Sequence, residues 1–179
     1  ENCNNRTIDL PAMEEGDALI YELNEANFTL PPTRVAGTLV PLFSLRSDSS
    51  FGVGDFGDLK KMVDWVSLTQ QKVLQILPIN DTTTTHTWTD SYPYSCISIF
   101  ALHPQYADLN ALPALKDKAQ RERFEKERRQ LNALPQMDYE RVNELKGEYL
   151  KLIYEQEGKA AIGSKEFKAF FAENESWLV

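Results

Sequence analysis

The sequence predicts an α/β fold built on parallel strands. Two mostly apolar runs of strand length, Val35 to Leu45 and Lys72 to Ile79, flank a segment with helical periodicity. Neither run alternates apolar and polar residues, so we expect both strands to be buried on both faces, as in a parallel sheet. A strand, a helix and a second strand within about 45 residues form a βαβ unit.

The predicted helix between these runs has a recognisable start. Asp55 is a good N-cap, because its carboxylate can accept hydrogen bonds from the first unpaired backbone N–H groups. The helix is expected to end near Thr69, and its apolar residues repeat at helical spacing: Phe56, Leu59, Val63 and Val66. The preceding Gly52-Val53-Gly54 is too short for a phosphate-binding fingerprint. These glycines either let the backbone approach a ligand or turn the chain into the helix.

Residues 112–179 are predicted to be helical. A segment rich in Lys, Glu and Arg, 115–134, is typical of a solvated helix with ion pairs, and Pro135 ends it. A third helix is expected to begin at Ser164. Between them lies a helix whose apolar residues are Tyr139, Val142, Leu145, Tyr149, Leu152 and Ile153.

These elements together predict the first βαβ part of a (β/α)8 TIM barrel with a helical insertion. Residues 1–34 are interpreted as a short β segment and linker, 35–111 as the barrel part, and 112–179 as the insertion. The chain begins without Met and without the features of a signal peptide. Because two strands cannot close an eight-stranded barrel, we interpret the chain as part of a longer enzyme-like fold.

Composition and charge exclude two classes of partner. The net charge is −8, and the whole acidic excess lies in residues 1–111, whereas phosphate binding needs a basic patch; nucleic acid is therefore not expected. No apolar run reaches the ~20 residues that span a bilayer, so no membrane segment is expected. Cys3 and Cys96 fit no metal motif and are interpreted as free thiols in a reducing, cytoplasmic compartment, with a disulfide as the alternative.

The segment from Leu77 to Tyr106 has the composition of a carbohydrate site. It follows the carboxyl end of the second strand, where parallel α/β folds bind ligands. Aromatic rings can pack on the apolar face of a pyranose, and carboxylates, amides and hydroxyls can bind its rim. The rings are Trp88, Tyr92 and Tyr94, and the polar residues are Asn80, Asp81, Asp90 and Ser91. The alternative is that the rings only pack the loop together.

Other residues of this segment allow weaker interpretations. Retaining glycosyl transfer needs two carboxyl groups about 5–5.5 Å apart, and Asp81 and Asp90 could provide them. An Asp in such a loop more often caps a turn. We interpret His86 as a solvated loop residue and His103 as a structural hydrogen-bonding group.

The same residues resemble a known family. "GTLVPLFSLRSDSSFGVGDFGDLKKMVDW", "VLQILPINDT" and "DSYPYSCISIFALHPQYADL" look like the opening of the catalytic domain of 4-α-glucanotransferases, the amylomaltases or disproportionating enzymes of glycoside hydrolase family 77. The plant-cytosolic-type branch and its bacterial relatives are most similar. The resemblance is close over about residues 36–111 and looser to the chain end.

This resemblance implies a fold, a reaction and a set of partners. The family fold is an α-amylase-like (β/α)8 barrel with helical insertions. Its reaction transfers α-1,4-glucan segments, with retention, between malto-oligosaccharides or to glucose, and starch or glycogen supplies such glucans. No metal or organic cofactor is implied. The remainder of the catalytic domain is the expected protein partner.

The resemblance also assigns site residues. The family's Pro-Tyr pair matches Pro93 and Tyr94, and Tyr94 is expected to stack on the sugar at the cleavage subsite. Asp90 and Ser91 match the family's Asp-Ser and are expected to shape or contact that subsite. Some members lack the residue inserted as Tyr92, whose role stays open.

The family's catalytic Asp nucleophile, Glu acid/base and stabilising Asp lie on later strands. No catalytic residue is therefore expected in this chain, which should be inactive alone, and Asp81 and Asp90 become binding or structural groups. "ENCNNRTIDLP" resembles the last strands of a family 20 starch-binding module. Two alternatives remain: a non-catalytic glucan-binding scaffold protein, or an α-amylase-type hydrolase.

Overall fold

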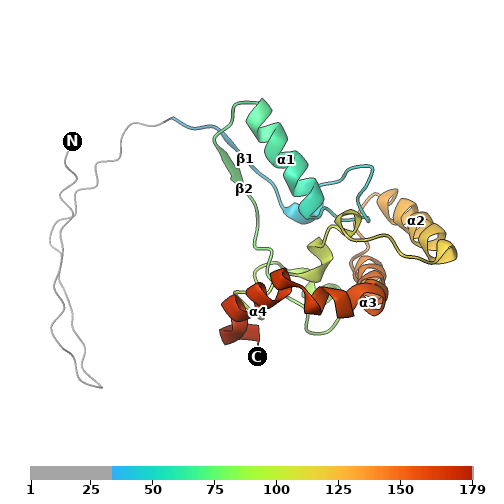
Figure 1. Cartoon of the computed structure of the whole chain (residues 1–179). Coiled ribbons are helices and arrows are strands. Elements are labelled where there is room, and N and C mark those ends of the chain that lie inside the picture. Colours follow the sequence, from blue (N-terminus) through green and yellow to red (C-terminus); the bar gives the residue numbers. More distant parts are fainter. Residues whose placement is uncertain (1–33, 179) are drawn as a thin grey trace, which may run out of the picture. The chain divides into compact units, whose positions relative to one another are not determined.

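Two short parallel strands begin the computed structural model, which describes residues 34–178 (Figure 1). β1 (Gly37–Leu39) pairs with β2 (Val73–Gln75), with Thr38 opposite Leu74. α1 (Phe56–Leu68) connects them, so the predicted strand–helix–strand order is confirmed. The strands predicted before residue 34, and Cys3, lie outside the described residues. The chain from Val35 onward forms one compact unit, to which the following description is confined.

The prediction that both strands are long and fully buried is wrong. Each has three residues, and Leu39 and Val73 are 57% and 46% exposed. Pro41 has no N–H for a ladder hydrogen bond, and the chain turns after it into a 3-10 helix, η1 (Leu42–Ser44). In the described part of the chain α1 contacts β2, and no second layer covers the other face of the sheet.

α1 begins where the sequence predicts. Asp55 Oδ1 accepts hydrogen bonds from the backbone N–H groups of Gly57 (2.9 Å) and Asp58 (3.2 Å), and Asp58 Oδ2 accepts from the N–H of Asp55 (3.3 Å). This reciprocal capping box satisfies N–H groups that the helix itself leaves free. The helix ends at Leu68 with Thr69 as its C-cap, as expected.

The glycine-rich loop before α1 is a tightly packed turn. Gly52 has a φ of +77°, and a Cβ there would lie 2.8 Å from Leu131 Cβ on α2 (Lys118–Asn132). A Cβ on Gly54 would lie 2.1 Å from the carbonyl oxygen of Leu42. Of the two roles considered for these glycines, the structure therefore assigns close backbone packing and a turn into the helix.

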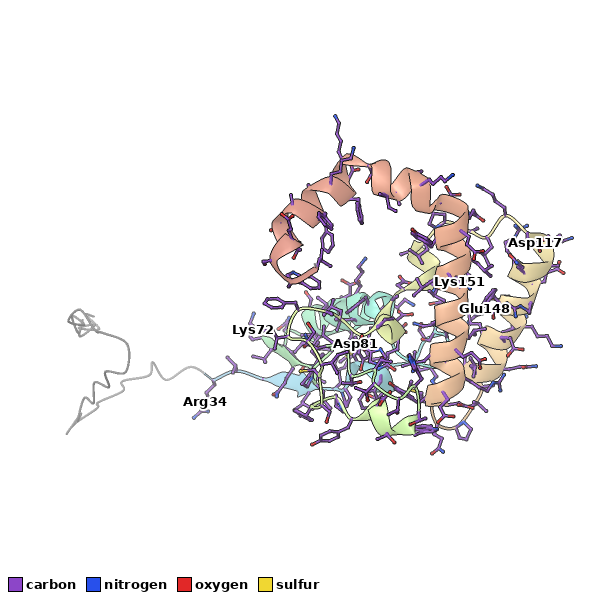
Figure 2. The ribbon with its side chains drawn as sticks, turned by 90° about the horizontal axis from the view of Figure 1, so that it is seen from below. Arg34, Lys72, Asp81, Asp117, Glu148 and Lys151 are labelled. Atoms are coloured by element: carbon purple, nitrogen blue, oxygen red, sulfur yellow. The ribbon has the colours of Figure 1, made fainter. Side chains whose placement is uncertain are left out.

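α2 and α3 (Tyr139–Gly163) lie side by side (Figure 2). Arg123 of α2 pairs with Glu148 of α3 at 2.5 Å. Within α2, Lys118–Glu122 and Glu125–Arg129 confirm the predicted ion pairs. Besides these surface pairs, the two helices share an apolar core with the loop before α1. Its buried residues are Phe51, Val53, Leu109, Leu115, Phe124, Leu131, Val142, Leu145 and Ile153.

α4 (Lys165–Leu178) follows α3 directly, as predicted. The hydroxyl of Ser164 accepts a hydrogen bond from the N–H of Phe167 (3.0 Å). No residue of α4 is buried, and Trp177 stacks on Phe100 with ring centroids 5.6 Å apart. None of the helices described between residues 34 and 178 has the length and apolar character needed to cross a membrane. The observed fold is thus a mixed α/β unit with a small parallel sheet and several helices.

Candidate functional site

The loop after β2 is closed at its base by backbone hydrogen bonds. Asn80 forms an antiparallel bridge with Leu102. Asp81 donates its N–H to Ala101 O (2.9 Å), and its own carbonyl accepts from Ile97 (2.8 Å). Three short 3-10 helices lie in or after this loop: η2 (Trp88–Ser91), η3 (Pro104–Tyr106) and η4 (Leu109–Ala111). The predicted site residues therefore belong to one closed loop.

Asp90 organises the threonine-rich part of this loop. Its carboxylate accepts five hydrogen bonds: from the N–H and hydroxyl groups of Thr84 and Thr85 and from the N–H of His86, at 2.7–3.0 Å. The side chain is 3% exposed. Burial by itself would raise the pKa of Asp90, but these donated hydrogen bonds outweigh it and hold that pKa well below its ordinary value. Asp90 is thus an ionised, fully bonded group that shapes the loop.

The three aromatic rings of the loop occupy two places. Trp88 packs against Tyr139 of α3, with centroids 5.8 Å apart, and is 49% exposed. Tyr92 and Tyr94 pack against each other, with centroids 5.5 Å apart at 49°, and each is 59% exposed. Pro93, between them, is half-buried. All three rings keep surface that a ligand could cover.

A cleft of about 690 Å³ lies beside Trp88. Its apolar lining includes Phe43, Trp88 and Tyr139, and its polar lining includes Arg46, Ser91 and Gln105. Of the predicted site residues, Trp88 and Ser91 line this cleft. Asn80, Asp90, Tyr92, Pro93 and Tyr94 do not.

The cleft contains residues that the sequence did not single out. Phe43 follows the carboxyl end of β1, and the ligand-position rule for parallel sheets could have indicated it. Arg46 donates Nη1 to the carbonyls of Asn132 (3.1 Å), the last residue of α2, and Leu134 (2.7 Å), just beyond it. It thereby fixes the α2–α3 connection as a wall of the cleft. No local sequence signal could have predicted a contact across more than 80 residues.

His103 and Tyr139 form a buried hydrogen-bonded pair behind the cleft. Nδ1 of His103 accepts from the N–H of Gln105 (3.2 Å), so Nε2 carries the proton of the neutral ring and faces the Tyr139 hydroxyl at 3.0 Å. Burial lowers the pKa of His103, with partial opposition from Asp81 and Asp90. Burial also raises the pKa of Tyr139 to about 12. The interpretation of His103 as a structural group is confirmed, and His86 is exposed as expected.

A buried ion pair joins α3 to the start of α1 next to these groups. Lys146 is 1% exposed and donates Nζ to the carbonyls of Gln105 (2.7 Å) and Ala107 (2.8 Å). The same ammonium lies 3.5 Å from Asp55 Oδ2, which has no other polar partner. Burial lowers the pKa of Lys146 and raises that of Asp55, because desolvation opposes both charges. The pair fixes Gln105, and with it one side of the cleft.

Residues 34–178 contain no cluster of three or more His, Cys, Asp or Glu side chains that could hold a metal ion. Cys96 is exposed and unpaired within the same range. Asp81 accepts a hydrogen bond from the N–H of Thr83 (2.9 Å) as in a turn. The described residues of the cleft and the aromatic loop therefore offer apolar and polar surface for binding a ligand.

Comparison with known proteins identifies the family. The family model of glycoside hydrolase family 77, described as 4-alpha-glucanotransferase, matches residues 40–179. The rice (Oryza sativa subsp. japonica) protein 4-alpha-glucanotransferase DPE2 is 37% identical over 97% of this chain and 18% of its own length. The 4-alpha-glucanotransferase of Chlamydia trachomatis is 41% identical over 66% of this chain and 21% of its own length.

The Chlamydia muridarum 4-alpha-glucanotransferase is 38% identical over 64% of this chain and 21% of its own length. The chain thus spans about a fifth of the length of these relatives. The match covers β2, the aromatic loop, the cleft and the four α-helices of the described residues, and begins directly after β1. The chain belongs to the 4-alpha-glucanotransferase family.

Proposed function

We propose that this chain is part of a retaining 4-α-glucanotransferase and contributes a section of its glucan-binding cleft. The enzyme would transfer α-1,4-glucan segments between malto-oligosaccharides, or from starch- or glycogen-type glucans to glucose. The observation that carries the proposal is the cleft beside Trp88. It combines aromatic faces with Arg, Ser and Gln groups at the carboxyl end of parallel strands. An apolar ring face and a polar rim match the two surfaces of a pyranose.

Tyr94 is proposed to stack on the sugar at the cleavage subsite. Its ring is 59% exposed, and contact with Tyr92 restrains it from one side. Asp90 is proposed to shape this subsite through the loop, because its carboxylate is already fully hydrogen-bonded. Ser91, at the edge of the cleft, and Asn80, at the base of the loop, are proposed to bind sugar hydroxyls, and Pro93 to orient Tyr94.

The catalytic carboxyl groups are proposed to come from other segments of a longer protein, so that this chain alone is inactive. Asp55 and Asp58 are buried in the capping box of α1, and Asp90 is held ionised. A catalytic acid must reach the substrate and hold a proton near neutral pH, whereas Asp55 and Asp58 are buried in the cap and Asp90 is ionised and fully hydrogen-bonded.

A (β/α)8 barrel is proposed to complete the fold. Leu39 on β1, Val73 on β2 and Leu68 on α1 are 57%, 46% and 82% exposed, and further strands and helices would cover them. A cytoplasmic location is proposed because the chain resembles the plant-cytosolic-type branch of the family. The reaction is proposed to need no metal or organic cofactor, as the family resemblance implies.

The test is product analysis from maltotriose with the longer protein that contains this chain. Glucose together with a ladder of longer maltodextrins is the expected result, because transfer lengthens one glucan while it shortens another. Glucose and maltose without longer products would show hydrolysis and contradict the proposed transfer reaction. Glucan binding without any turnover would contradict the proposed enzyme and indicate a non-catalytic scaffold protein.

A further inference from the structure

We propose that Glu140 is a positioning residue that holds Trp88 in place as a wall of the glucan cleft. This inference rests on the proposed function and adds a residue of the helical segment to its site. Glu140 lies in the first turn of α3, directly after Tyr139. It is 52 residues from Trp88 in the sequence, and only the tertiary fold brings them together.

The contact is made to the backbone of the aromatic loop. The N–H of Trp88 donates a hydrogen bond to Glu140 Oε1 at 3.1 Å. Trp88 is the first residue of η2, and Asp90, its third residue, is anchored by hydrogen bonds from Thr84, Thr85 and His86. Glu140 therefore fixes the beginning of this short helix, and Asp90 fixes its end. A ring mounted on a segment with two anchors loses little further freedom when a ligand binds.

The ring of Trp88 packs against Tyr139, while Glu140 holds the Trp88 backbone. Tyr139 is 3% exposed, its hydroxyl faces His103 Nε2 at 3.0 Å, and its ring packs on Trp88 with centroids 5.8 Å apart. α3 is itself fixed at this end, because Asp138 Oδ1 accepts from the N–H of Arg141 (3.2 Å). Adjacent residues of one rigid helical turn thus contact the backbone and the ring of Trp88.

Glu140 is exposed to solvent, so its replacement should leave the apolar core intact. The test measures KM and kcat for maltotriose disproportionation by the longer protein that contains this chain. Glu140→Ala should raise KM about two- to tenfold, the range given by loss of one hydrogen bond, with kcat nearly unchanged. Glu140→Gln should restore the KM of the unaltered protein, because its amide oxygen can accept the same bond.

Two further variants make the test specific. Glu144→Ala, one turn later on the same helix, removes an exposed carboxylate of the same charge and should leave KM unchanged. In a Trp88→Ala background the ring is absent, so Glu140→Ala should add no further increase in KM. A double-mutant cycle of this kind isolates an effect that acts through Trp88.

The outcomes separate this inference from the function on which it rests. A rise in KM for Trp88→Ala but none for Glu140→Ala would overturn the inference and leave the function standing. An equal rise for Glu140→Ala with and without Trp88 would also overturn it. If Trp88→Ala left KM unchanged, the role of Trp88 and this inference would both fall while transfer itself persisted. Absence of maltodextrin transfer in the unaltered protein would overturn the proposed function.

Discussion

Replacing Lys146 with Met should loosen the attachment of α3 to the start of α1. Met fills a similar volume but supplies no charge and no donor. The substitution leaves the carbonyls of Gln105 and Ala107 without the Nζ partner at 2.7 and 2.8 Å. It also leaves Asp55 Oδ2, 3.5 Å from Nζ, as a buried carboxylate oxygen with no polar partner.

The stability lost in the Lys146→Met variant can be estimated from the burial of the Lys146–Asp55 pair. Both side chains are at least 97% buried, and removing one partner of a buried ion pair costs about 3–5 kcal/mol. At about 1.4 kcal/mol for each factor of ten, amide protection in α3 should fall by roughly two to three and a half orders of magnitude. The fall is bounded by the free energy of unfolding of the whole unit.

Amide hydrogen exchange followed by mass spectrometry measures this effect on peptides from α3 and α1. Lys151→Met is the matched control, since Lys151 is an exposed lysine of the same helix (Figure 2) and should change protection little. Asp55→Asn combined with Lys146→Met should recover part of the loss, because Asn still caps α1 and leaves no buried charge. A loss of protection below tenfold in Lys146→Met would refute the assigned role of the pair.

Three further predictions concern the site and its loops. Tyr94→Ala should lower kcat/KM for maltotriose about 5- to 150-fold, the effect of losing a stacking platform worth about 1–3 kcal/mol. The unfolding temperature should fall as the pH drops below 6.5, because burial lowers the pKa of His103 and the unfolded chain takes up that proton first. The His103→Gln variant should show a flatter pH dependence between about pH 5 and 6.5. Gly54→Ala should destabilise the fold by about 1–3 kcal/mol or more in thermal unfolding, because its Cβ would lie 2.1 Å from a carbonyl oxygen.

Each of these predictions has a matched control. Tyr154→Ala removes an exposed tyrosine on α3, and an equal loss of activity there would remove the assigned role of Tyr94. His86→Asn changes an exposed histidine, and the pH slope should survive it. Gly147→Ala places a Cβ where no atom lies within 4 Å, so it should be neutral or stabilising in the helix. Equal destabilisation by both glycine variants would contradict the packing argument.

Local signals predicted α1 and the start of α4 well. The cap at Asp55 depends on hydrogen bonds between residues at most three apart, so the sequence contains all that decides it. The burial of β1 was predicted wrongly, because apolar composition says which residues can be buried but not what covers them. In the described chain no layer covers the exposed side of Leu39.

The residues of the cleft were predictable from the sequence only in part, and their arrangement was not. Ring and hydroxyl composition pointed to Trp88 and Ser91, and both line the cleft. The same composition could not tell whether Asp90 would face a ligand or the loop, since five donors converge on it only in the folded loop. The wall fixed by Arg46 depends on carbonyls 86 and 88 residues away, beyond any local pattern.

The most direct test of the central claim is an NMR titration of the protein labelled with 15N-tryptophan. The indole signal of Trp88 would be assigned with a Trp88→Phe variant. Maltohexaose is expected to shift this signal, while Trp65 and Trp177 stay unchanged and cellohexaose, a β-linked glucan, produces no shift. A maltohexaose response confined to Trp65 or Trp177, or an equal response of Trp88 to both glucans, would contradict the assignment of this cleft to α-1,4-glucans.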